Sequence, residues 1–180
     1  MNTIPKLKQF IAQIAQKHQF DLYQTAAYLR LNLNEDRLII ENIGASRISI
    51  AYHLFLLDEW IAEPEIVVWT AYAPLREAAR EGQWVPIELS LIKDGWKACA
   101  KIDTNGNLVA FYHHEWHAWL VDFVETAVVP NLIRQGWLEQ GVKSDEPPPS
   151  YTTLEQKRER GYLLAEDVYP DEEVNDDIPF

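Results

Sequence analysis

Val85-Pro-Ile-Glu-Leu-Ser-Leu-Ile-Lys-Asp-Gly-Trp-Lys-Ala-Cys-Ala-Lys-Ile102 is the stretch that decides the fold. Apolar residues recur at every second position in each half of it, as in a strand with one buried face. Asp94-Gly95 stands between the two halves, and Asp-Gly between alternating runs is a strong signal for a β-hairpin. We therefore predict two antiparallel strands, Val85–Leu91 and Trp96–Ile102, that meet at this turn.

A period of two also marks the sequence before the hairpin. It predicts strands over residues 26–33, 37–41, 46–56 and 66–72, separated by turns. Asp58-Glu59-Trp60 and Glu63-Pro64-Glu65 are expected to interrupt the chain between the last two of these strands. A short helix over residues 74–81, stopped at Gly82, should precede the hairpin.

Helical spacing appears at both ends of this strand-rich region. Residues 5–18 predict an amphipathic helix, with Thr3 as its N-cap and Pro5 in its first turn. After a reversal at 103–107 and a strand at 108–112, the period becomes helical again near Glu115. Pro130 is expected to kink or interrupt that second helix, which has few other breaks before Gly136.

These elements predict an α+β fold. An antiparallel meander sheet of about six or seven strands would be covered by the N-terminal helix and by the long helix after the sheet. The order of elements is loosely similar to that of small bacterial secretion chaperones and related adaptor proteins, a likeness that concerns the fold alone. Residues 1–142 would form one domain, and 143–180 a Pro-rich linker with an acidic tail and a short helix near 152–165.

Composition and charge narrow the classes of partner. The formal net charge is −12, and residues 143–180 contribute 11 acids and 4 bases to it. Without a Lys/Arg stripe, direct nucleic-acid binding is disfavoured, and an acidic surface favours a protein partner with a basic surface. No apolar run is long enough to span a membrane, and the single cysteine, Cys99, cannot form an internal disulfide, so we expect a cytoplasmic protein.

One segment concentrates the residues most suited to chemistry: His113, His114, Glu115, Trp116 and His117. Imidazole binds metals and transfers protons near neutral pH. The zinc motif His-Glu-x-x-His is one residue too long for this segment, and Glu115 lies off the face that an i, i+4 histidine pair would share. One hypothesis is a metal or small-ligand site at this segment, with a third ligand from His53 or from an acidic residue. The other is an aromatic junction between strand and helix, in which the imidazoles form hydrogen bonds with backbone groups. No cofactor is predicted.

Other catalytic patterns are incomplete. Cys99 lies between Lys97 and Lys101, which could lower its pKa and make it a nucleophile, although a lone strand cysteine is more often a packing residue. Carboxylates around Trp60 are typical of sugar sites, but their spacing specifies no geometry. The chain has no Gly-rich phosphate loop.

The acidic tail intersperses apolar anchors with carboxylates: Tyr162, Leu163, Tyr169 and Phe180. Such a segment can dock on a partner and fold there, pack on its own domain or its dimer mate, or serve only solubility. The sequence therefore predicts a non-enzymatic, cytoplasmic protein-binding module of adaptor, chaperone-like or regulatory type. The alternative is a metal- or small-ligand-binding protein or enzyme centred on the histidines, and a third hypothesis is acidic mimicry of nucleic acid. An edge strand or an exposed tryptophan face could also support a homodimer.

Overall fold

The computed structural model describes residues 2–56, 58–70, 82–103 and 105–146. Seven strands form an antiparallel sheet in the order β6-β5-β4-β3-β2-β1-β9, which confirms the predicted meander. The strand bounds are β1 Tyr28–Leu33, β2 Asp36–Gly44, β3 Arg47–Leu56, β4 Glu59–Thr70, β5 Trp84–Leu91, β6 Gly95–Ala98 and β9 Val142–Lys143.

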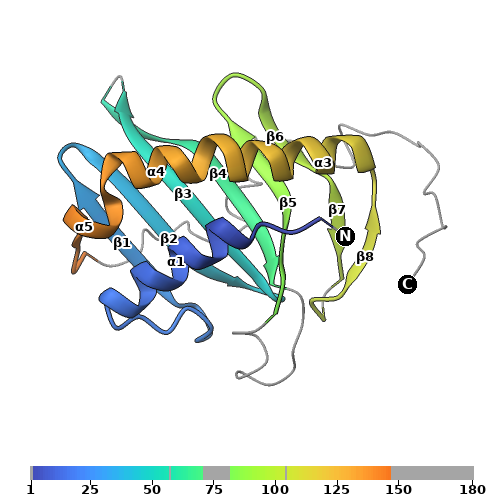
Figure 1. The fold of residues 1–180 in the computed structure, drawn as a ribbon, viewed down its shortest axis with the longest axis horizontal. Coiled ribbons are helices and arrows are strands. Elements are labelled where there is room, and N and C mark those ends of the chain that lie inside the picture. The colour runs from blue at the N-terminus through green and yellow to red at the C-terminus, as the bar shows by residue number, and fades with distance from the viewer. Residues whose placement is uncertain (1, 57, 71–81, 104, 147–180) are drawn as a thin grey trace.

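Two helical segments lie side by side over one face of this sheet and form a single layer (Figure 1). The first is α1, Pro5–Lys17; the second is a continuous helical path made of α3 His114–Phe123, the π-helical turn η1 Val124–Val128 and α4 Val129–Gln135. A short α5, Trp137–Gln140, follows. The large core lies between helices and sheet and draws on both layers, including Leu7, Ile11, Leu38, Ile50, Leu120 and Trp137.

The predicted hairpin forms only in the part next to its turn, between β5 and β6. β5 and β6 pair around Asp94-Gly95, but the second arm leaves the sheet at Cys99, and Ala100–Ile102 becomes β7, which pairs with β8, Leu108–Phe111. Ala100 packs with Val67 and Trp69 in a second, smaller core. The prediction of one strand over Trp96–Ile102 was wrong. The apolar alternation in the sequence runs through Cys99, but the hydrogen-bond partner changes there from β5 to β8.

The predicted interruption before the fourth strand was also wrong. β4 runs without a break from Glu59 to Thr70 and includes the cis Glu63–Pro64 peptide. Glu65 pairs with Ala51 and Ala62 pairs with His53, so Glu63 and Pro64 lie where the register shifts. A bulge tolerates proline because the missing N–H is not needed there for the ladder.

The helices begin and end close to the predicted residues, with one difference at the N-cap of α1. Ile4, rather than the predicted Thr3, is the N-cap of α1, and it makes no side-chain cap hydrogen bond. The α-helical pattern is interrupted just before Pro130, as expected, by η1, and α4 ends at Gly136 with φ 84°. Proline at this point lacks the N–H that a regular helix would use, and a π-helical turn accommodates the irregular ladder.

The sheet extends past the predicted end of the domain. Val142 and Lys143 pair with Asn32 and Leu31, and the buried Arg30 binds Ser144 and forms an ion pair with Glu146. The short helices predicted at 74–81 and 152–165 lie outside the described residues. Among the described helices, none combines the length and apolar character needed to cross a bilayer.

Candidate functional site

The five residues of the histidine segment lie at the junction of β8 and α3 and differ in burial. His113 is the extended residue that precedes α3, with φ −141° and ψ 100°. His114 and Glu115 are exposed in the first helical turn, and Trp116 is half-buried. His117 is buried, with 5% of its surface exposed. The helix therefore begins inside the segment and separates its side chains by depth.

Among the histidines of this segment, His117 is the one that is buried. Its ring centroid lies 4.6 Å from that of Phe111, which also contacts His114 at 5.9 Å. Burial, aided by the nearby His114, lowers the pKa of His117 to about 4. No described atom forms a hydrogen bond with its Nε2. His117 is thus neutral at physiological pH and functions as an aromatic packing residue.

The described residues at this junction do not form a set of three metal ligands. Within the described ranges, no three His, Cys, Asp or Glu side chains are grouped as metal ligands. His53, considered as a further ligand, follows Tyr52 on β3, and Tyr52 faces the helices. Since neighbouring strand residues point to opposite faces, His53 lies across the sheet from α3.

The other sequence candidates have structural partners. The Cys99 thiol is fully buried, and burial raises its pKa to about 12. This agrees with the packing residue that the sequence favoured and not with a nucleophile activated by Lys97 and Lys101. The guanidinium of Arg37 covers the Trp60 ring at 3.5 Å, which leaves that face unavailable to a sugar. The predicted tail anchors Tyr162, Leu163, Tyr169 and Phe180 lie outside the described residues.

A surface feature of α3 emerges that the sequence pattern did not single out. Trp116, Trp119 and Phe123 form a stacked row, which we call the aromatic strip. Trp116 and Trp119 have ring centroids 6.1 Å apart, and Trp119 and Phe123 have centroids 5.2 Å apart with rings inclined by only 6°. Trp119 keeps 46% of its surface exposed. The spacing i, i+3, i+7 is a local signal that could have predicted this row; of its three residues only Trp116 was a candidate, as part of the histidine segment.

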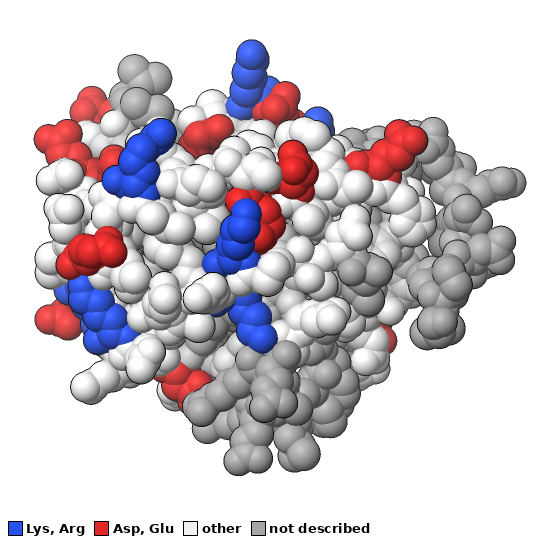
Figure 2. Space-filling model, viewed as in Figure 1, with Lys and Arg blue, Asp and Glu red and all other residues white. Residues whose placement is uncertain are grey.

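Two carboxylates lie near the exposed tryptophan of the aromatic strip along α3. Glu115 and Asp122 are exposed on α3, one turn on either side of Trp119. No lysine or arginine occurs between Lys101 and Arg134 in the sequence. The helix-bearing surface is otherwise mostly uncharged, with scattered acidic and basic side chains (Figure 2). An exposed tryptophan with neighbouring carboxylates is suited to a cation, because the ring face and the carboxylates both attract positive charge.

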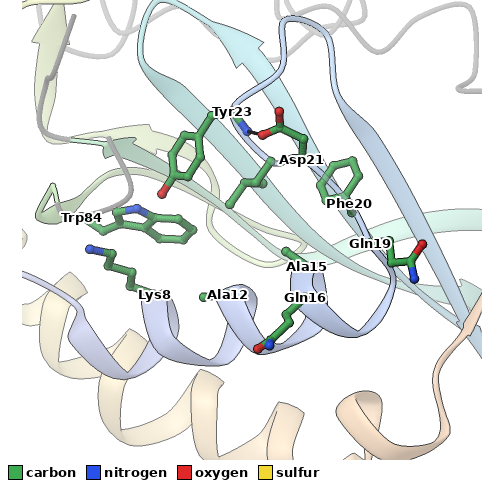
Figure 3. A pocket seen from close by; sticks show the side chains of 10 residues that line it. Lys8, Ala12, Ala15, Gln16, Gln19, Phe20, Asp21, Tyr23 and Trp84 are labelled. Atoms are coloured by element: carbon green, nitrogen blue, oxygen red, sulfur yellow. Dashed lines mark hydrogen bonds between the residues drawn. The ribbon is translucent and has the colours of Figure 1, made fainter. Parts of the chain in front are cut away.

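A cavity of about 470 Å³ lies beside α1 (Figure 3). Residues from α1, from the segment that follows it and from the start of β5 line it: Lys8, Ala12, Ala15, Gln16, Gln19, Phe20, Asp21, Leu22, Tyr23 and Trp84. No local motif predicts this cavity, because its wall combines segments some 60 residues apart.

Comparison of the chain with protein-family models, with curated proteins and with solved structures finds no match in any of the three. Any functional interpretation therefore rests on the residues and their geometry.

Proposed function

We propose that this protein is a non-enzymatic module that binds a basic segment of another protein through the aromatic strip on α3. The observation that carries the proposal is the exposure of Trp119 within a stacked row of three aromatic side chains. Large aromatic residues are usually buried, and exposed tryptophans are enriched at protein interfaces. Stacking on both neighbours pre-orders the Trp119 ring, so a partner would lose less side-chain entropy on binding it.

The basic character of the partner follows from charge. Glu115 and Asp122 flank Trp119, and the whole chain carries a net charge of −12. Arginine is the best match, because its planar guanidinium stacks on an indole ring and bonds carboxylates at the same time. A second copy of this chain, or its own tail of 11 acids and 4 bases, would bring like charge to the strip.

The alternative of an enzyme or metal protein centred on the histidines has less support. It would need imidazoles that accept protons or ligands near neutral pH, whereas His117 has a pKa of about 4 and is buried. A cytoplasmic, adaptor-like or regulatory role remains part of the proposal, since Cys99 is the sole cysteine and needs no oxidising compartment.

Peptide titration tests the proposal. A peptide of alternating arginine and leucine should bind the full chain, and its affinity should fall as salt rises. Counterparts with citrulline or glutamate in place of arginine should bind much more weakly. Trp119→Ala should weaken binding of the arginine peptide about tenfold, the value expected when one cation–π and stacking contact is removed.

Ile92→Ala is the matched control, because Ile92 is as exposed as Trp119 but lies at the β5–β6 turn. It should leave peptide affinity unchanged, and circular dichroism should show both variants folded. Equal affinity of Trp119→Ala and the parent, or equal binding of the citrulline and arginine peptides, would refute the proposed site.

A further inference from the structure

The cavity beside α1 has features of a ligand site that are independent of the aromatic strip. Its volume, about 470 Å³, falls within the range of pockets for small molecules. Six of its ten lining residues have apolar or aromatic side chains: Ala12, Ala15, Phe20, Leu22, Tyr23 and Trp84. A few polar side chains, from Lys8, Gln16, Gln19 and Asp21, complete the wall. An apolar pocket with a few polar groups is the usual composition of such sites.

Trp84 supplies the observation that points to a ligand. Its side chain is among the largest fully buried ones, with 1% of the residue exposed. The indole Nε1 is buried, and no described atom accepts a hydrogen bond from it. Buried tryptophan N–H groups normally have an acceptor, since leaving one without a partner costs about 1–3 kcal/mol. The backbone carbonyl of Trp84 accepts a hydrogen bond from Ile4 N at 3.0 Å, which anchors the residue to the start of α1.

Lys8 adds a second donor beside the same ring. Its Nζ donates to Gly82 O at 2.6 Å, and an ammonium group has three donors in all. Figure 3 shows the Lys8 side chain rising from α1 toward Trp84, with the ammonium and the indole ring on the same side of the cavity. The carboxylate of Asp21 accepts a hydrogen bond from Tyr23 N at 3.2 Å.

We infer that this cavity binds a small hydrophobic carboxylic acid as its anion. The carboxylate would accept hydrogen bonds from the Trp84 indole and the Lys8 ammonium, and the apolar body would lie against the aromatic and alanine wall. The indole N–H has almost no accessible surface in this structure, so neighbouring side chains must move before a carboxylate can reach it; the hydrogen bond would then form in a region of low dielectric constant, where such bonds are strong. The long side chains of Lys8, Gln16 and Gln19 can rotate to admit the carboxylate.

Nuclear magnetic resonance of the indole N–H groups tests the inference on the full chain. The probe is phenylpropionate, compared with phenylpropionamide and phenylpropylamine, which keep its body but replace the carboxylate by a neutral and a cationic group. Phenylpropionate should shift the indole resonance of Trp84, identified by its loss in Trp84→Phe, and the amide and the amine should bind at least about tenfold more weakly.

Lys8→Met and Ala12→Trp separate loss of binding from loss of folding. The first removes the ammonium but keeps an apolar stem, and the second fills the cavity from an exposed position of α1. Both should lower phenylpropionate affinity at least about tenfold, while the control Lys93→Met, at an exposed position of the β5–β6 turn, should not. No shift of the Trp84 resonance by phenylpropionate, binding unaltered in Lys8→Met and Ala12→Trp, or equal binding of the amine would overturn the inference.

Discussion

At the scale of single residues, depth in the fold decides which side chains can do chemistry. His117 looked like a candidate ligand because of its neighbours in the sequence, yet it is buried against Phe111 and its pKa falls to about 4. The ordinary pKa of 6.5 applies to the unfolded chain. Between these two values the unfolded state binds the proton more readily than the folded state does, so stability must fall as pH is lowered through that interval.

His117→Leu should therefore reduce the loss of stability on acidification. The parent should lose about 2–3 kcal/mol through this residue between pH 6.5 and 4, and this contribution should be fully present above pH 6.5. Urea unfolding at a series of pH values measures it, as the difference between the parent and the variant. His114→Gln removes only the smaller cause of the shift and should retain most of the effect. Parallel pH dependences of parent and His117→Leu would contradict the assignment.

Cys99 gives a second prediction at this scale. Its Sγ lies 3.3 Å from Ile87 O inside the core, and burial raises the thiol pKa to about 12. The thiolate is the reactive form, so the folded protein should react with a thiol reagent far more slowly than the urea-unfolded chain does. A native reaction as fast as that of the unfolded chain would show that the thiol is accessible.

At the scale of elements, a residue of the η1 turn caps the N-terminus of α1, although the two lie far apart in the sequence. α1 has no side-chain cap of its own, and Glu125 from the η1 turn accepts hydrogen bonds from Lys6 N and Leu7 N at 3.0 and 3.1 Å. A carboxylate there satisfies free N–H groups and interacts favourably with the positive end of the helix dipole. The irregular turn before Pro130 thus carries the residue that caps α1.

Glu125→Ala should destabilise the protein by about 1–2 kcal/mol, because it removes both the cap and the charge at the α1 N-terminus. Glu125→Gln, which keeps an acceptor but loses the charge, should cost less. Urea unfolding provides the measurement. Asp122→Ala is the control, since Asp122 is an exposed residue of the same helical path and lies outside the first turn of α3. A cost equal to that of Glu125→Ala would argue against the capping role.

At the scale of the whole molecule, one glycine joins the small sheet to the large one. Gly106, with φ 85°, lies in the turn between β7 and β8, and its carbonyl accepts a hydrogen bond from Trp69 Nε1 on β4 at 2.9 Å. A Cβ on Gly106 would lie 2.8 Å from the carbonyl carbon of Ala45, in the β2–β3 turn. This close approach leaves no room for a side chain.

Gly106→Ala should therefore destabilise the protein by at least about 2 kcal/mol, from left-handed backbone strain and the clash together. Gly95→Ala is a matched comparison, because Gly95 has φ 71° but open space around its Cα. It should cost only the backbone term, about 1–2 kcal/mol. Thermal or urea unfolding of both variants measures the loss of stability. Equal losses for Gly106→Ala and Gly95→Ala would contradict the close packing of the β7–β8 turn against the β2–β3 turn.

The class of fold follows from local patterns in the amino-acid sequence. The alternating apolar positions of Val85–Leu91, the Asp94-Gly95 turn and the helical spacing after Glu115 are local patterns, and each became the element it predicted. Local patterns succeed here because the sheet is a meander, in which most neighbouring strands are also neighbours in the chain.

Features that join distant segments became apparent only in the folded chain. The departure of Ala100–Ile102 from the large sheet, the cap that Glu125 provides for α1 and the cavity between Lys8 and Trp84 each depend on residues far apart in the sequence. The aromatic strip is local in sequence, but its exposure depends on which face of α3 the sheet buries. Side-chain periodicity records which residues are apolar, whereas burial, pKa and partner depend on what packs against them.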